Sequence, residues 1–242
     1  MTDYRLDQFL QKTAGVSRKE AGKIIRGRWV TVNGETVTAR DYKVSVTDKI
    51  YLDDELLIHN NEYRYFVLYK PAGYVSSHRH DGHLSLFTLL DEPIEDLHIA
   101  GRLDADTTGL VLITNDGAWS HAVTHPKGNQ ALDKVKKVYD VELAAPITAE
   151  MIQALETGVM LNGETTITKP AEVIMIDTLH IQLILIEGRY HQVKRMLAAV
   201  GNRVEKLHRA AIGNITLEGL AVGEYRALTI EEREGLINGR SK

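Results

Sequence analysis

Two carboxylates, Asp104 and Asp106, stand two residues apart just before an apolar run at residues 110–113. A carboxylate can attack an electrophilic carbon and form a covalent intermediate, so each is a candidate nucleophile. The run is short, rich in branched side chains and followed by an Asn-Asp-Gly turn sequence, which predicts a buried strand closed by a tight turn. Asp104 would then lie in the loop that enters the strand, where it either reacts or caps its own turn.

Paired carboxylates also serve glycoside hydrolases, and clustered histidines can bind metals. Side chains two apart on an extended segment point to opposite faces, so Asp104 and Asp106 are poorly placed to flank a sugar bond. His78, His80 and His83 have neither an HExxH pattern nor a cysteine beside them. We therefore expect no metal there, and interpret this segment as a polar loop.

Two further segments carry candidate residues on predicted elements. Residues 137–143 alternate in polarity, which predicts a strand with Lys137 and Tyr139 on the same face. Residues 193–200 carry apolar side chains at helical spacing, so Lys194 points away from the buried face. By spacing alone, the tyrosine is a packed core residue and the lysine belongs to a solvated surface.

The amino-terminal segment predicts two helices and a hairpin. Apolar side chains at helical spacing place a short helix around residues 6–10. Ser17 followed by Glu20 is a capping box that opens a second helix, and Asn33-Gly34 predicts a type I′ hairpin turn.

This segment is also locally basic. Within residues 1–28, seven basic residues face three acidic ones, a local charge of +4. Such side chains bind phosphates with little regard for base sequence. The residues that we predict to contact RNA are Arg5, Arg18, Lys19, Lys23, Arg26 and Arg28.

The composition limits what the protein can be. The 242-residue chain has a net charge of −4 and a pI near 6.2, which argues against indiscriminate coating of nucleic acid but allows a local basic surface. It has no cysteine, hence no disulfide and no thiolate site, and no apolar run long enough to span a membrane. Nor do the first residues resemble a signal peptide, so we expect a cytoplasmic protein. A polar, acidic interval at residues 53–62 reads as a linker between two domains, residues 1–59 and 60–242.

Four motifs in order resemble the RsuA branch of pseudouridine synthases, which detach uracil from its ribose in RNA and reattach it through carbon. They are Lys70-Pro71-x-Gly73-Tyr74, Gly101-Arg102-Leu103-Asp104-x-Asp106-Thr107-Thr108-Gly109-Leu110, Lys137-x-Tyr139, and residues 187–197 with the sequence EGRYHQVKRML. The amino-terminal pattern resembles the S4 RNA-binding domain, through Arg5-Leu6-Asp7-x-Phe9-Leu10, Ser17-Arg18-x-Glu20-Ala21 and Val30-x-Val32-Asn33-Gly34.

The resemblance implies an α+β fold: an S4-like α/β RNA-binding module, then a catalytic domain with a mixed, largely antiparallel sheet flanked by helices. It also implies that the enzyme isomerises a specific uridine of small-subunit (16S) ribosomal RNA, after the base is flipped out of its stack.

By the same resemblance, Asp104 is the nucleophile, acting at the sugar C1′ or by proton abstraction that forms a glycal; the sequence leaves both routes open. Tyr139 stacks on the uracil, and Lys194 keeps the Asp104 carboxylate ionised. Arg102 holds either the flipped conformation or a neighbouring phosphate. Asp106 is the rival nucleophile. The uracil is both leaving group and incoming nucleophile, so we expect neither cofactor nor metal.

Two alternatives stay open beside this hypothesis. An enzyme of the same family would act on large-subunit (23S) RNA, and a non-catalytic assembly factor would grip ribosomal RNA without isomerising it. In the preferred interpretation the partner is 16S rRNA or a small-subunit assembly intermediate, and we expect a monomer that does not bind membranes.

Overall fold

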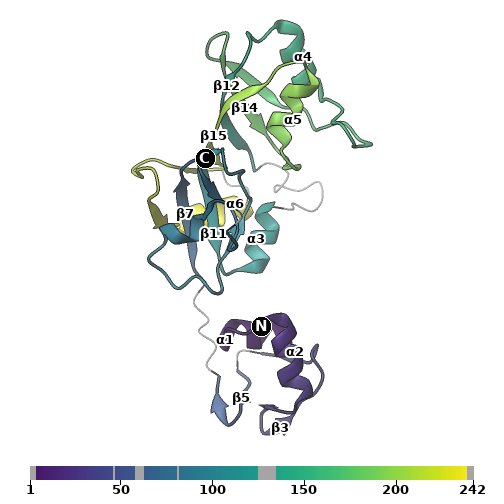
Figure 1. Cartoon of the computed structure of the whole chain (residues 1–242), viewed down its shortest axis with the longest axis vertical. Helices are drawn as coiled ribbons and strands as arrows, with labels where there is room; N and C mark the ends of the chain where they lie inside the picture. The colour runs from purple at the N-terminus through teal and green to yellow at the C-terminus, as the bar shows by residue number, and fades with distance from the viewer. Residues whose placement is uncertain (1–3, 46, 58–62, 81, 125–134, 239–242) are drawn as a thin grey trace. The chain divides into compact units, whose positions relative to one another are not determined.

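The computed structural model describes residues 4–45, 47–57, 63–80, 82–124 and 135–238. The chain divides into two compact units (Figure 1). One comprises Met1–Tyr63 with Pro93–Leu97, and the other comprises Arg64–Glu92 with His98–Lys242. The expected boundary after residue 59 falls outside the described residues.

The amino-terminal unit packs two helices against short strands. Leu6, Phe9 and Leu10 of α1 meet Ala21 and Ile25 of α2 in a core where each side chain is almost fully buried. The helices are α1 (Leu6–Thr13) and α2 (Arg18–Arg26). The strands are β1 (Tyr4–Arg5), β2 (Val30–Val32), β3 (Glu35–Thr36), β4 (Lys43–Val44), β5 (Ile50–Leu52) and β6 (Glu55–Leu56), paired in the orders β1-β4 and β3-β2-β5-β6.

Local sequence signals account for most of this unit. The capping box at the start of α2 is present, because the Ser17 hydroxyl accepts from the Glu20 N–H and the Glu20 carboxylate accepts from the Ser17 N–H. Asn33 and Gly34 both have positive φ, as the predicted hairpin turn requires.

The predicted linker at residues 53–62 is wrong at its start. Asp53 and Asp54 form the turn between β5 and β6, both with positive φ, which aspartate tolerates better than most residues. Polar, acidic residues favour such a turn as much as they favour a linker. The rest of the interval, from residue 58, lies outside the described residues.

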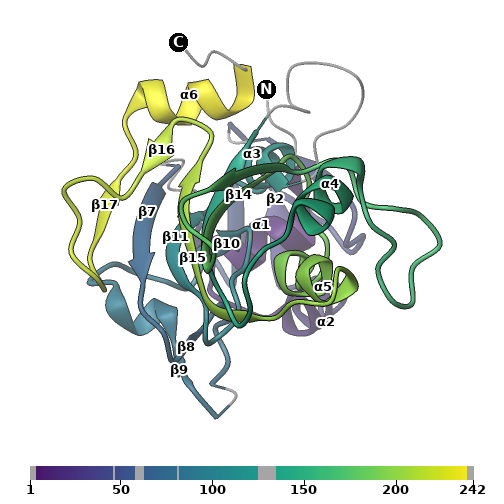
Figure 2. The same cartoon turned by 90° about the horizontal axis from the view of Figure 1, so that it is seen from above.

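A nine-stranded sheet organises the second unit (Figure 2). Its strand order is β13-β14-β12-β15-β11-β7-β17, with β10 paired to β11 and β16 paired to β15. Only the β11–β15 pair of this sheet is parallel among the described residues, so the predicted mixed, largely antiparallel sheet is confirmed. The strands are β7 (Tyr65–Lys70), β10 (His98–Ala100), β11 (Thr108–Thr114), β12 (Lys137–Leu143), β13 (Glu172–Met175), β14 (His180–Leu185), β15 (Val204–Ile212), β16 (Ile215–Thr216) and β17 (Tyr225–Ala227).

Helices accompany both parts of this sheet. α3 and α6 lie beside β7 and β11, whereas α4 and α5 lie beside β12 and β14 (Figure 1). The helices are α3 (Gly117–Thr124), α4 (Ala149–Thr157), α5 (Gln192–Ala199) and α6 (Ile230–Asn238), with a 3₁₀ helix η1 (Leu86–Leu89) and a short parallel pair, β8 (Tyr74–Val75) with β9 (Leu84–Ser85). No helix in the described part of the chain is long and apolar enough to cross a bilayer.

The parallel pair of β11 and β15 brings together parts of the sequence that are about 100 residues apart. Thr108 and Gly109 of β11 pair with His208 and Arg209 of β15. Gly109 has a φ of +113°, and a Cβ at this position would lie 2.4 Å from the Arg209 carbonyl oxygen. Glycine is therefore required for the two strands to approach this closely.

Candidate active site

Asp104 lies in the loop between β10 and β11, with 29% of its side chain exposed. Its Oδ2 is 3.1 Å from Lys194 Nζ, and its Oδ1 is 3.0 Å from His191 Nε2. Both partners come from the start of α5, where His191 adopts a left-handed conformation with a φ of 47°. The carboxylate is thus held through both oxygens by one short segment.

The Lys194 ammonium also bridges to the second carboxylate. It donates to Asp106 Oδ1 at 2.7 Å and to Oδ2 at 2.9 Å. This hydrogen bond holds the pKa of Asp106 below its usual range. Burial alone would lower the pKa of Lys194, but its hydrogen bonds to Asp106 and Asp104 raise it above the ordinary lysine value, so the amine stays charged at neutral pH.

Two of the three predicted substrate-binding residues, Arg102 and Tyr139, line the same large cleft as Asp104. The cleft has a volume of about 820 Å³, within the range of small-ligand sites, and its walls include Arg102, Asp104, Tyr139 and His191. Tyr139 is 8% exposed, whereas Arg102 is exposed. A smaller adjoining cavity of about 70 Å³ is lined by Arg102, Asp104, Tyr139, His191 and Lys194. The structure therefore brings together all four residues that the sequence singled out.

A fully buried lysine fixes the loop that carries Asp104. Lys70, at the end of β7, donates to the carbonyl oxygens of Thr107 at 2.7 Å, Pro71 at 3.0 Å and Ala105 at 3.2 Å. Burial lowers the pKa of Lys70 to about 8. The ammonium thus ties β7 to the backbone on the carboxyl side of Asp104.

Two other side chains hold this loop by hydrogen bonds, Ser76 on its amino side and Arg209 on both sides. The Ser76 hydroxyl donates to the Leu103 carbonyl at 2.7 Å and accepts from the Leu103 N–H at 3.1 Å. Arg209, on β15, donates to the carbonyl oxygens of Gly101 and Leu110, both at 2.8 Å. Because both ends of the loop are anchored, Asp104 is presented on a rigid support, as precise positioning requires.

Lys137 contributes a further cation to the cleft wall, near Tyr139 on β12. Burial, together with the nearby Arg209 charge, lowers the pKa of Lys137 to about 8. Lys137 and Tyr139 face the same side of β12, as the alternation predicted, because the inward-facing residues of this strand are all buried.

The predicted RNA-contacting residues lie in the other unit. Arg18, Lys19, Lys23, Arg26 and Arg28 are exposed, and Arg5 is half-buried. Burial would raise the pKa of Asp7, but the Arg5 hydrogen bond and the charges of Arg5, Arg18 and Arg40 hold it below its ordinary value. Asp7 thus gathers three arginines, with contacts of 3.0 Å to Arg5 and 3.8 Å to Arg18 and Arg40. Sequence reasoning missed Arg40, because it lies outside the basic segment at residues 1–28.

The sequence analysis also missed His191, Lys70 and Arg209. Both His191 and Lys70 stand inside motifs that it quoted, but nothing in their spacing marks them as partners of the Asp104 loop. The histidine loop has other contacts: the His78 ring stacks on Phe87 at 3.9 Å, and His80 Nδ1 accepts from the Ser85 N–H. Among the described residues, no group of three His, Cys, Asp or Glu side chains is placed to hold a metal ion.

Comparison with known proteins identifies both units. Residues 64–199 match the RNA pseudouridylate synthase family, and residues 5–50 match the S4 domain. The chain is 47% identical to "Ribosomal small subunit pseudouridine synthase A" of Pasteurella multocida and to the protein of the same name from Escherichia coli (strain K12), in each case over 94% of this chain and 97% of the relative.

A solved pseudouridylate synthase structure agrees with these matches. It superposes with a TM-score of 0.69 at 45% identity, covering 96% of this chain and 99% of the other. The similarity therefore extends over both units rather than one motif. The chain belongs to the RNA pseudouridylate synthase family and carries an S4 domain ahead of its synthase domain.

Proposed function

We propose that this protein isomerises one uridine of 16S ribosomal RNA to pseudouridine, with Asp104 as the nucleophile. One observation carries the proposal: the Asp104 carboxylate sits in a cleft beside Tyr139, with Lys194 and His191 on its two oxygens. Such fixed partners hold the carboxylate in one orientation, so little reorganisation is needed when the substrate arrives.

The reaction replaces a carbon–nitrogen bond with a carbon–carbon bond. The C1′–N1 bond of the uridine breaks, the freed uracil turns to present C5, and a C1′–C5 bond forms; C5 then gives its proton to a base or water, and N1 takes up a proton. Asp104 either bonds to C1′ while the uracil turns, or takes a proton from the sugar to give a glycal; it is regenerated at the end in both routes. Every heavy atom of the product comes from the uridine, and the proton lost at C5 balances the one gained at N1, so the step needs only proton exchange with water.

The remaining cleft residues bind and hold the nucleotide. A base within an RNA stack is out of reach of Asp104 and must be flipped out, at a cost of a few kcal/mol. The buried Tyr139 ring offers the uracil a flat surface, and stacking on an aromatic ring contributes about 1–3 kcal/mol per base. Arg102 and Lys137 line the same cleft and can neutralise a phosphate or hold the flipped conformation.

The choice of 16S RNA is supported by the names of the relatives, which are small-subunit enzymes. The exposed arginines and lysines of the S4 domain would bind phosphates of the same RNA, either free or in an assembling subunit. We infer that the protein works in the cytoplasm as a monomer.

Pseudouridine mapping of ribosomal RNA from cells with and without the gene tests the proposal. We expect one site in 16S RNA to be lost and to return when the gene is restored. Loss confined to 23S RNA would transfer the activity to the large subunit. If no site is lost while the purified protein binds 16S RNA, it is an assembly factor instead.

A further inference from the structure

An exposed aromatic ring stands at the mouth of the cleft. The Tyr190 residue is 76% exposed, and one face of its ring stacks on the His191 ring, with centroids 3.7 Å apart and an angle of 25° between the planes. His191 in turn contacts Asp104 Oδ1 at 3.0 Å. Asp104, His191 and Tyr190 are therefore joined by successive contacts, one polar and one stacked, and all three residues line the cleft.

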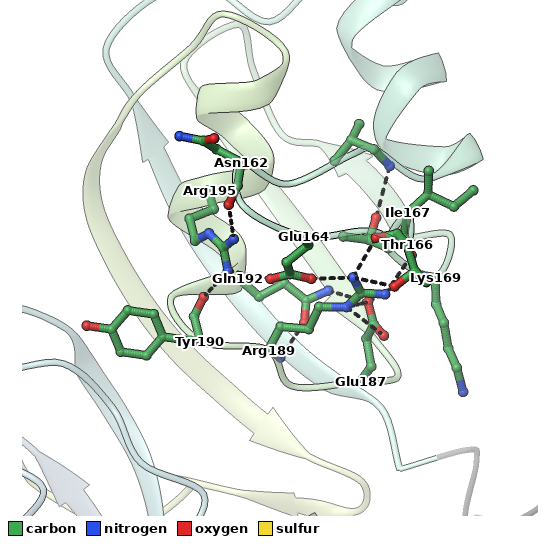
Figure 3. Close-up of polar contacts among 12 residues, drawn as sticks. Asn162, Glu164, Thr166, Ile167, Lys169, Glu187, Arg189, Tyr190, Gln192 and Arg195 are labelled. Atoms are coloured by element: carbon green, nitrogen blue, oxygen red, sulfur yellow. Dashed lines mark hydrogen bonds and ion pairs between the residues drawn. The ribbon is translucent and has the colours of Figure 1, made fainter.

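The backbone beneath this ring is firmly held (Figure 3). Arg195 donates to the Tyr190 carbonyl oxygen at 3.0 Å, and the same guanidinium donates to Glu164 at 2.6 Å and to the Asn162 carbonyl at 2.7 Å. In the figure the Tyr190 ring points away from this network. The ring is thus displayed by a fixed support.

The same network locks the other side of the segment. Glu164 accepts from Arg189 at 2.5 Å as well as from Arg195, so one carboxylate joins the two arginines that flank Tyr190. Arg189 also donates to the Ile167 carbonyl at 2.6 Å. The side chains of Glu164, Arg189 and Arg195 are each only about a quarter exposed, and ion pairs there are screened less than on an open surface.

We propose that the outer face of the Tyr190 ring stacks the base of a nucleotide next to the target uridine; this proposal rests on the proposed function. The inner face is covered by His191, so the outer face is the one left for a ligand. When the uridine flips into the cleft its neighbours lose a stacking partner, and an aromatic ring at the cleft edge replaces it. Arg102, exposed on the same cleft, supplies charge for the phosphate between the two nucleotides.

Aromatic stacking of this kind tolerates any base, since every base has a flat face. Tyr190 would therefore contribute affinity and hold the strand in place without selecting sequence. Loss of one such stack corresponds to a five- to 150-fold loss of affinity. Phenylalanine would preserve the effect, because the ring and not the hydroxyl makes the contact.

The first test is equilibrium filter binding to a full-length 16S RNA transcript, in an Asp104→Asn chain so that no turnover intervenes. We expect Tyr190→Ala to weaken binding about tenfold, and Tyr190→Phe to bind as the parent does. The matched control is Ile176→Ala, which removes an apolar side chain of similar exposure (68%) that does not line the cleft.

The second test uses short RNA fragments that carry the mapped uridine, with the base removed from its 5′ or 3′ neighbour. If Tyr190 stacks that base, one of the two abasic fragments binds the parent about tenfold more weakly, and Tyr190→Ala adds no further loss. Two results would overturn the stacking site alone. One is unchanged RNA affinity in Tyr190→Ala; the other is that each abasic fragment loses as much affinity for the Tyr190→Ala protein as for the parent. Failure of the parent to bind the transcript would instead overturn the proposed function and the stacking site with it.

Discussion

The Nζ of Lys194 lies 3.1 Å from Oδ2 of Asp104, although the two residues are 90 positions apart in the sequence. The same ammonium bonds Asp106, so one cation serves two carboxylates of unequal exposure, 29% for Asp104 and 73% for Asp106. Asp104, the less exposed of the two, lines the same cavity as Tyr139. This asymmetry distinguishes the two candidate nucleophiles and leads to the first predictions.

We expect Asp104→Asn to lower pseudouridine formation by at least about a thousandfold, because the amide keeps the shape of the side chain but cannot act as a nucleophile or base. Binding to a 16S RNA transcript should survive. Turnover is measured by pseudouridine formation in that transcript, and binding by filter retention. A variant that keeps more than a few per cent of its turnover would rule out Asp104 as the reacting group.

Asp106→Asn serves as the matched control, with an expected loss of less than about tenfold, because an exposed ion pair contributes little. Lys194→Met, in contrast, leaves the half-buried Asp104 carboxylate without its cation and should cost at least about a hundredfold in kcat, with Lys194→Arg recovering part of it. If Asp106→Asn lowered kcat more than Lys194→Met did, Asp106 rather than Asp104 would be the catalytic carboxylate.

The pH dependence follows from Lys137, whose pKa lies at about 8. A lysine with a lowered pKa carries its charge below pH 8 and loses it above, whereas an ordinary lysine stays charged to about pH 10. We therefore expect kcat/KM to fall as the pH rises through 8. In Lys137→Arg the fall in kcat/KM above pH 8 should be smaller. The fall that remains is assigned to Lys70, whose pKa is also about 8. An unchanged fall in Lys137→Arg would exclude a role for the Lys137 charge.

The close approach of β11 and β15 predicts a severe stability defect. Gly109→Ala would place a Cβ 2.4 Å from the Arg209 carbonyl oxygen at a positive φ, and should lower the free energy of unfolding by more than about 3 kcal/mol. Gly219→Ala is the control: its φ is also positive (+77°) but its Cβ meets open space, so it should cost about 1 kcal/mol. Urea unfolding compares the two; equal losses would mean that the strands can separate without cost.

The exposed charges of α2 predict the salt dependence of RNA binding. Replacing Lys19 and Lys23 with Gln should reduce the slope of log K against log salt by about 0.7–0.9 for each phosphate contact removed. Lys206→Gln is the control, since Lys206 is paired with Glu142 on the sheet of the other unit. If both variants changed the slope equally, α2 would have no special part in binding.

Features set by neighbouring residues could be predicted from the sequence. The capping box at Ser17, the turn at Asn33-Gly34 and the buried strand after Asp104 each follow from a few adjacent side chains. Local patterns also mislead, as at Asp53-Asp54, where a turn and a linker have the same composition. The pairing of Tyr139 and Lys194 with Asp104 was expected through family motifs alone, because periodicity made one a core residue and the other a solvated one.

What the sequence could not supply depends on contacts across the fold. The parallel pairing of β11 with β15 joins residues 100 positions apart, and no local pattern encodes it. Lysines are seldom fully buried, so the sequence did not mark Lys70 as the support of the Asp104 loop. Its hydrogen bonds to three carbonyl oxygens are seen only in the structure. His191 was missed for a different reason: it contacts Asp104 from a left-handed backbone conformation, which is uncommon for any residue other than glycine and which no local pattern predicted here.

The order of these segments along the chain has a consequence for synthesis. During translation Asp104 is made about 5–20 s before β15, at typical elongation rates of about 5–20 residues per second. Until the carboxy-terminal half emerges, the nascent chain has neither the cation for this carboxylate nor the strand that closes the sheet around it. If Asp104 is the nucleophile, we therefore expect a truncated or half-translated product to lack synthase activity, even with its S4 domain complete.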